Sequence, residues 1–229
     1  MLIPNESISM AEWGFEYNDY GYIHFESHSQ IYNFLLRCQA AYGILAEAEL
    51  LYITDILFKN WMSFDPCTKD NTFLAQKNGT GLSRSPYVEP SRLADICLEH
   101  IEKEDPLVYP LNINFTGWGI IIDESGEKVK RRSLMKMAVT TMGFPTVEIV
   151  TYSDVWLPYD IYAKPQPKLH ELNAPRLEKA LTEVKEALGV DSIFEGNQLV
   201  EQDKEFTLMN YVDGFGDVLS YDHLSMRVL

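Results

Sequence analysis

The sequence predicts an α+β fold: a mainly antiparallel sheet packed with a long N-terminal helix, or a helix pair, and an amphipathic helix in the C-terminal half. Apolar residues recur at helical spacing between residues 31 and 62, and the pattern becomes extended after Leu107. Strands do not alternate regularly with helices, which disfavours a doubly wound parallel sheet. We expect residues 1–229 to form one domain, because no linker supports a division near residue 106.

The N-terminal 26 residues are aromatic and predict one or two strands. Trp13-Gly-Phe15-Glu-Tyr17 alternates as a half-buried strand does, and residues 22–25 alternate loosely. Six aromatic residues in so short a segment also argue against a loose tail.

A long helical region follows. Ser27 with Gln30 three residues later is typical of a capping box. The helical spacing then continues to Met62, which is long for one globular helix. We therefore expect a break or kink at Gly43, and an end before Pro66.

Residues 63–90 have the composition of a loop. A loop of this length is uncommon in a compact domain, so it is either functional or contains a short element near residues 72–76. A second helix is expected from Pro90-Ser91, with an apolar stripe that begins at Leu93, and Asp105-Pro106 ends it.

Extended structure follows this helix. Residues 111–115 alternate, Gly117-Trp-Gly119 interrupts, and residues 120–122 resume. Asp123-Glu-Ser-Gly-Glu127 predicts a hairpin connection to a returning strand at 129–141, although residues 134–138 also suit a short helix. Residues 146–152 form the most β-prone run of the chain.

The C-terminal part predicts one clear helix and further strands. Residues 153–172 read as an extended, proline-rich segment. Asn173 then suits an N-cap with Pro175 in the first turn, and Gly189 suits the C-cap. The expected apolar stripe of this helix is Leu177, Leu181, Val184 and Leu188. Strands are expected at 193–194 and 206–211, before a turn at 213–217.

Composition limits the partners of the chain. The formal net charge is −15, which disfavours a general nucleic-acid binder or a membrane-surface protein and leaves a basic protein as the matching partner. Neither a secretory signal nor a run of about 18 apolar residues is visible in the sequence. Three widely spaced cysteines (Cys38, Cys67 and Cys97) form neither a disulfide framework nor a zinc pattern. We therefore expect a reduced, cytoplasmic compartment.

The negative charge is concentrated at the two ends. Residues 1–26 hold five acidic and no basic residues, and residues 190–229 hold eight acidic and two basic ones. If the two ends meet in the fold, they form one acidic face where a partner would bind. The opposite concentration, five basic residues within 128–136, is expected to pair within the protein or to be solvated: Lys128, Lys130, Arg131, Arg132 and Lys136.

Two constellations offer metal or catalytic chemistry. On a strand, His24, Glu26 and His28 would share one side and could bind a metal, but the expected helix start at Ser27 breaks that alternation. Acidic residues with glycines at 213–217, near Asp222-His223, can hold a divalent cation or orient a general base. A turn is the favoured interpretation, because the spacing does not match a calcium loop.

The segment Asp154-Val-Trp156-Leu-Pro-Tyr159-Asp160 combines aromatic and acidic groups. Such groups are typical of interface anchors toward Arg or Lys on a partner. The equally weighted alternative is that Val155 and Leu157 pack in the core, with the aromatics at the sheet edge.

A family resemblance rests on the C-terminal half. Tyr152-Ser-Asp154-Val-Trp-Leu-Pro158-Tyr-Asp160, followed by Leu172-Asn173-Ala-Pro-Arg176-Leu177 and a leucine-rich helix ending at Gly189, resembles immunity-type proteins of bacterial polymorphic toxin systems. The similarity covers about a fifth of the chain. The Leu-Pro-x-x-Tyr signature of another large immunity superfamily is not reproduced. The resemblance implies a small acidic cytoplasmic protein that neutralises a toxin, often a basic nuclease, by binding it.

We therefore expect a non-enzymatic, immunity-like inhibitor of a basic partner protein, with no cofactor and no catalytic residue. The expected partner-binding residues are Asp154, Trp156, Tyr159, Asp160, Asp213 and Asp217. One alternative is a metal-assisted hydrolase that uses histidine and aspartate residues. Another is a structural or regulatory subunit of an oligomer, since the sequence leaves the oligomeric state open.

Overall fold

A computed structural model describes residues 9–17, 28–64, 73–77, 81–84, 87–102, 108–141, 145–197 and 199–221. The N-terminal half contains β1 (Ala11–Glu16), α1 (His28–Glu47), β2 (Tyr52–Phe64), β3 (Phe73–Lys77), β4 (Gly81–Arg84), a 3₁₀ turn (Pro90–Arg92) and α2 (Leu93–Glu102). The rest contains β5 (Val108–Ile122), β6 (Lys128–Thr140), β7 (Thr146–Thr151), α3 (Pro167–Leu188), β8 (Ser192–Gly196), β9 (Val200–Lys204) and β10 (Thr207–Asn210).

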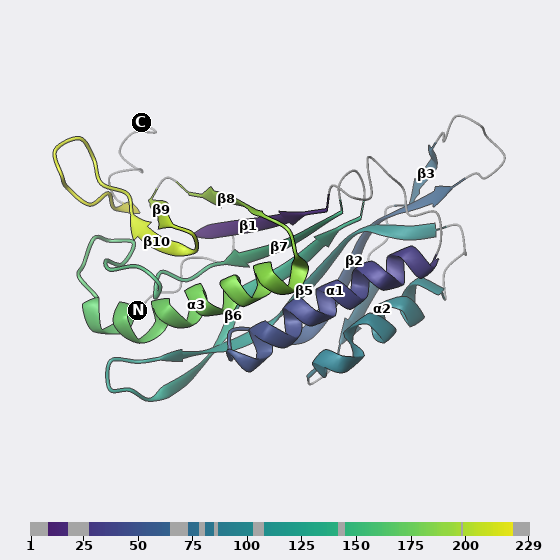
Figure 1. Cartoon of the computed structure of the whole chain (residues 1–229), viewed down its shortest axis with the longest axis horizontal. Coiled ribbons are helices and arrows are strands. Elements are labelled where there is room, and N and C mark those ends of the chain that lie inside the picture. The colour runs from purple at the N-terminus through teal and green to yellow at the C-terminus, as the bar shows by residue number, and fades with distance from the viewer. Residues whose placement is uncertain are drawn as a thin grey trace.

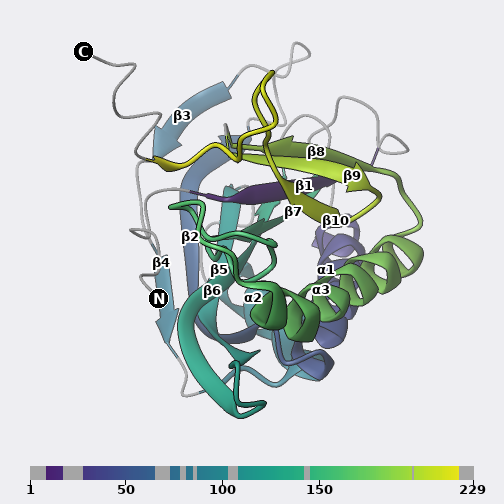
Figure 2. The same cartoon turned by 90° about the vertical axis from the view of Figure 1, so that its left-hand side faces the viewer.

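The main sheet has eight strands in the order β3-β2-β5-β6-β7-β1-β8, with β4 also paired to β2. Every pairing in it is antiparallel. The sheet curves around α1 and α3, and α2 packs beside α1 (Figures 1 and 2). The predicted α+β class with a mainly antiparallel sheet is confirmed.

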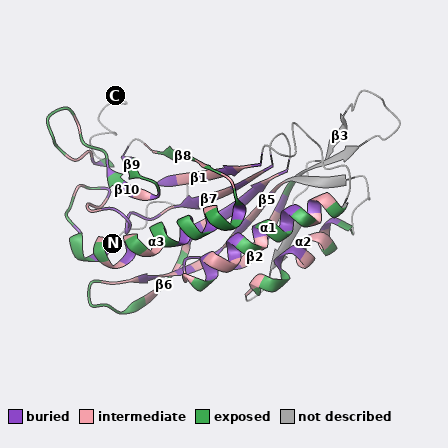
Figure 3. Cartoon of the chain, viewed as in Figure 1, coloured by how far each residue is buried: buried purple, intermediate pink, exposed green. Residues whose placement is uncertain are grey.

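The core lies between the inner face of the sheet and the helices. Trp13 and Phe15 of β1 point into it, as do Phe34 and Leu35 of α1, and all four are fully buried. In Figure 3 the sides of the helices that face the sheet are buried and the outer sides are exposed. Cys38 and Cys97 pack in this core as free thiols.

The second half of the expected N-terminal helix is a strand. α1 passes through Gly43 as an unbroken helix and ends at Glu47, and residues 52–64 form β2. The pairing of β2 with β5 shifts register between Ile53 and Asp55. This bulge turns both Ile53 and Ile56 into the core, so an i, i+3 spacing that is typical of a helix occurs on a strand.

α3 begins earlier than the sequence indicates. Its first residue is Pro167, at a position where the missing N–H costs nothing, and Pro175 lies inside the helix. Asn173 is therefore not an N-cap. Its fully buried amide accepts a hydrogen bond from Ile122 N (2.8 Å) and donates one to Ile122 O (2.7 Å), which attaches α3 to the end of β5. The predicted stripe and the left-handed Gly189 cap are confirmed.

Three further expectations concern the strands. β5 continues through Gly117 and Gly119, so these glycines do not interrupt the strand. A Cβ at these positions would overlap the carbonyl oxygens of Tyr52 and Leu50, respectively. The two glycines therefore allow the backbone of residues 50–52 to lie close to β5. β6 is a strand, which excludes the short helix at 134–138. The 63–90 region contains β3 and β4, and β9 at 200–204 was not predicted.

Candidate functional site

Trp156, one of the expected surface anchors, belongs to the core. Its side chain is fully buried, and the indole N–H donates a hydrogen bond to Thr151 Oγ1 over 2.7 Å. Val155 and Leu157 on either side are also buried. The three consecutive apolar residues are removed from water together, which the hydrophobic effect favours. The prediction that Trp156 contacts a partner from the surface is therefore wrong. Val155 and Leu157 pack in the core as the alternative states, but Trp156 is buried with them instead of lying at the sheet edge.

Asp154 is also buried, but only one of its two carboxylate oxygens accepts a hydrogen bond. Only 2% of the residue is exposed. Its Oδ2 accepts a hydrogen bond from Ile161 N (3.2 Å), whereas Oδ1 has no hydrogen-bond partner in the described part of the chain. Burial raises the pKa of this carboxyl, and the Ile161 amide offsets that rise only in part. An unpaired oxygen on a buried carboxyl destabilises the fold, so its presence here requires an explanation.

Tyr159 and Asp160 shape the chain between Asp154 and α3. The Asn210 side chain pairs with both backbone groups of Tyr159, accepting from N (3.0 Å) and donating to O (2.9 Å). Asp160 Oδ1 accepts hydrogen bonds from the backbone N–H groups of Tyr162 and Lys164. These contacts hold the segment between β10 and the start of α3.

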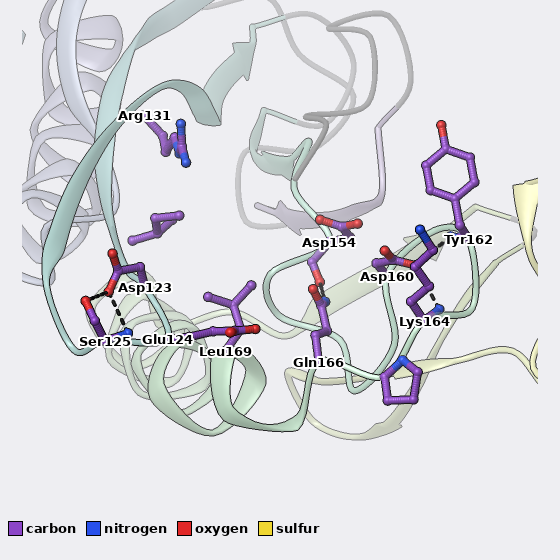
Figure 4. A pocket seen from close by; sticks show the side chains of 12 residues that line it. Asp123, Glu124, Ser125, Arg131, Asp154, Asp160, Tyr162, Lys164, Gln166 and Leu169 are labelled. Carbon is purple, nitrogen blue, oxygen red and sulfur yellow. Dashed lines mark hydrogen bonds between the residues drawn. The ribbon is translucent and has the colours of Figure 1, made fainter.

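A pocket of about 480 Å³ opens between the β5–β6 hairpin, this segment and the start of α3 (Figure 4). Figure 4 shows Arg131 and Asp154 reaching it from different elements. Four carboxylate and two cationic side chains line it, together with polar and apolar groups: Ile121, Asp123, Glu124, Ser125, Arg131, Asp154, Asp160, Tyr162, Lys164, Pro165, Gln166 and Leu169.

A second polar atom in the pocket wall is unsatisfied. Arg131 Nε is buried and has no hydrogen-bond partner among the described residues. Gln166, at the N-cap position of α3, does not cap the helix; its Nε2 donates to the carbonyl oxygens of Asp154 (2.6 Å) and Leu157 (3.0 Å). The positive end of the α3 dipole therefore lies beside the pocket without a side-chain cap.

Two other members of the basic cluster have partners inside the protein. Lys128 forms an ion pair with Glu49 (2.6 Å), and the Lys130 ammonium lies 3.7 Å from the centre of the Trp118 ring. The intramolecular interpretation is confirmed for these two residues. Arg131 differs from them, because it faces the pocket.

Asp213 and Asp217 lie at a protruding turn. Asp213 Oδ1 accepts hydrogen bonds from the backbone N–H groups of Phe215 (2.8 Å) and Asp217 (3.0 Å). This closes the turn and confirms that the acidic residues with glycines shape the chain. Phe215 at the tip is 94% exposed. The turn projects from the end of the molecule where α3 begins, and residues 214–217 are exposed (Figures 1 and 3).

We call this region the C-terminal surface. Its exposed apolar side chains are Met209, Tyr211, Val212, Phe215 and Tyr221, and its acidic residues are Glu201, Asp203, Glu205, Asp213 and Asp217. Glu201 and Met209 are opposed across β9 and β10 and are both exposed, whereas Leu208 of the same hairpin is buried. The C-terminal surface adjoins the pocket, because Tyr221 N donates to Ile161 O (2.7 Å).

The two acidic ends of the chain meet, as far as the described residues extend. β1 pairs with β8, and Glu12 stands opposite Glu195. Partial burial raises the pKa of Glu12, and the negative charges of Glu148 and Glu195 raise it further, while Lys136 lowers it. The acidic ends therefore lie side by side on the last two strands of the sheet, β1 and β8, and Lys136 offsets part of their negative charge.

The metal hypothesis has no support in the described residues. His24 and Glu26 lie outside them, as does Asp222-His223. His28 is the first residue of α1, so a strand alternation from His24 does not reach it. Among the residues that the structure describes, there is no group of three His, Cys, Asp or Glu side chains that could hold a metal ion.

Comparison with protein-family models and with curated proteins finds no match to this chain. Among the described helices, none has the length and apolar character to cross a membrane.

Sequence reasoning identified Asp154 and Asp160 but missed Arg131, Gln166 and Phe215. In the sequence Arg131 is one of five similar cations, and only the fold distinguishes its position from that of Lys130. The sequence does indicate that Phe215 is exposed, because it lies between two glycines that have no side chains to pack against it.

Proposed function

We propose that this protein is a non-enzymatic binding protein, an immunity-like inhibitor that holds a basic protein partner in the bacterial cytoplasm. The exposure of Phe215 between Asp213 and Asp217 carries the proposal. An aromatic side chain that is 94% exposed on a hydrogen-bonded turn is already positioned for a partner. Buried aromatic anchors contribute most of the binding energy in many interfaces.

The composition of the C-terminal surface supports a basic partner. Its exposed apolar side chains all belong to residues 209–221, and exposed apolar side chains gathered in one part of a protein are typical of interaction sites. The same part of the chain, residues 201–217, carries five acidic residues, of which Glu205 is paired with Lys185, and one exposed lysine, Lys204. Together with the net charge of −15, this arrangement would accelerate association with a positively charged surface and would exclude acidic ones. A toxin nuclease is a partner of this chemistry, in line with the family resemblance.

The test compares two matched substitutions. Phe215→Gln removes the exposed aromatic side chain, and Leu36→Gln makes the same kind of change at an exposed position of α1, far from the C-terminal surface. Wild type and both variants are immobilised and exposed to lysate of the source cells at low and moderate salt. We expect wild type and Leu36→Gln to retain one basic protein in stoichiometric amount, and Phe215→Gln to lose it.

The retained protein is then purified, and its affinity and activity are measured. Phe215→Gln should weaken binding about thirtyfold or more, as expected for an interface hot spot. Stoichiometric wild-type protein should suppress the activity of the partner. Equal binding by Phe215→Gln and wild type, or retention of no basic protein by wild type, would contradict the proposal.

A further inference from the structure

The pocket next to the C-terminal surface is lined by one carboxyl and one guanidinium group that each have a polar atom without a hydrogen bond. Asp154 offers Oδ1 as an acceptor and Arg131 offers Nε–H as a donor, and neither atom has a partner in the described chain. The hydrogen bond from Ile161 N to Oδ2 holds the Asp154 carboxyl in place, and Arg131 is a residue of the paired strand β6. Leaving two such groups unpaired in one pocket destabilises the free protein, which is a common property of binding sites.

The excess of carboxylates determines which charge the pocket accepts. Asp123, Glu124, Asp154 and Asp160 line it against Arg131 and Lys164. Asp123 and Asp160 already accept hydrogen bonds from their own turns through Oδ1. The buried and unpaired carboxyl oxygen of Asp154 is therefore the strongest acceptor for a cationic group that enters the pocket.

We propose that the pocket binds arginine, with the guanidinium group paired to Asp154 and a carbonyl or carboxylate oxygen of the same residue accepting from Arg131. Guanidinium suits a buried carboxylate better than ammonium, because it is more weakly hydrated and offers several donors in one plane. Lys164 and the uncapped start of α3 favour the oxygen end of the ligand.

The proposal does not require the proposed function, although the arginine of a basic partner is one source of this group. Free arginine is the other source. Both present the same guanidinium to Asp154, and they differ in the oxygen that they present to Arg131.

The test is a calorimetric titration with three probes: capped arginine (N-acetyl-L-arginine N-methylamide), free L-arginine, and capped citrulline, which has the same shape without the charge. Asp154→Asn removes the counter-ion and keeps the volume. Asp191→Asn is the matched control at an exposed aspartate outside both the pocket lining and the C-terminal surface. A thermal melt of each variant confirms that it is folded.

We expect saturable binding of an arginine probe by wild type and Asp191→Asn, and at least tenfold weaker binding by Asp154→Asn. Capped citrulline should also bind at least tenfold more weakly than capped arginine. Tighter binding of the capped probe indicates a protein side chain as the source, and tighter binding of free arginine indicates a small molecule.

Equal binding of citrulline and arginine, equal binding by folded Asp154→Asn and wild type, or no binding of either arginine probe would overturn the inference. None of these results depends on whether Phe215→Gln loses a protein partner. The two proposals can therefore fail separately.

Discussion

Two segments of this chain have similar composition and opposite fates. In residues 154–160, Trp156 lies near two aspartates and is fully buried. In residues 213–217, Phe215 lies between two aspartates and is 94% exposed. The first segment forms one wall of a pocket, and the second forms the tip of a protruding turn.

The immediate neighbours explain the difference. Trp156 is flanked by Val155 and Leu157, so the whole run gains from burial, and Thr151 Oγ1 receives its indole N–H. Phe215 is flanked by glycines, and Gly216 adopts a φ of +91° that suits a tight turn. A composition of aromatic and acidic residues therefore does not distinguish a surface segment from a core segment. The residues on either side of the aromatic distinguish them.

The largest expected effect is at the buried aromatic. Trp156→Ala removes a fully buried side chain and leaves a cavity, so the free energy of unfolding should fall by about 3–5 kcal/mol. Chemical denaturation at pH 7 measures it, with Phe215→Ala as the reference. A loss of less than about 1 kcal/mol would show that the segment is not part of the core.

The next effect is at the contact that holds the 154–160 segment to β10. Asn210→Ala removes the partner of both Tyr159 N and Tyr159 O, and the residue is only 5% exposed. We expect a loss of about 1–3 kcal/mol. Faster hydrogen exchange of the Tyr159 amide should accompany it. Unchanged exchange at that amide would show that the pair does not hold the segment.

A smaller effect, of opposite sign, is expected at Asp154. Burial raises its pKa in the folded protein above the usual 3.8, so the folded state binds the proton more tightly than the unfolded state does. The stability of wild type therefore falls as the pH rises from about 3.8 through the raised value. Asp154→Asn does not titrate and should be more stable than wild type at pH 7 by about 1 kcal/mol.

The pH dependence distinguishes this explanation from a general gain in packing. The advantage of Asp154→Asn should shrink as the pH falls through this range and vanish below the pKa of the unfolded chain. Thermal melts at several pH values check it, with Asp217→Asn as the exposed control. A difference that stays constant with pH would contradict the assignment.

The smallest effect is at the exposed aromatic. Phe215→Gln should change the free energy of unfolding by less than about 0.5 kcal/mol, because the side chain has almost no contacts to lose. The same denaturation experiment measures it. A loss above 1 kcal/mol would mean that Phe215 packs on the protein in solution, and would remove the basis of the C-terminal surface.

The sequence predicts the parts of the fold whose pattern is local. The β5–β6 hairpin, β7, α2 and the stripe of α3 follow from alternation, helical spacing and caps. β2 could not be predicted in the same way, because the bulge between Ile53 and Asp55 reverses the alternation. The start of α3 was missed because Asn173-x-Pro175 imitates a cap, while the real function of Asn173 depends on Ile122.

Only part of the candidate site can be predicted from the sequence. Asp154 and Asp160 stand out by composition, but their positions depend on amides that follow them. The pocket combines residues of the β5–β6 hairpin with residues 154–169. No spacing in the sequence indicates that Arg131 and Asp154 share it, because that proximity results from long-range strand pairing.

The position of β1 has a consequence for how the chain is made. β1 lies between β7 and β8, and Glu16 pairs with Thr146 while Ala11 pairs with Gly196. During synthesis the first strand therefore emerges long before either neighbour, and it has to wait for most of the protein to be translated. Closing such distant contacts is slow, and the waiting strand exposes Trp13 and Phe15 in the meantime. A nascent chain that stalls before residue 146 would thus present an unpaired aromatic strand, which is a target for chaperones and a hazard for aggregation.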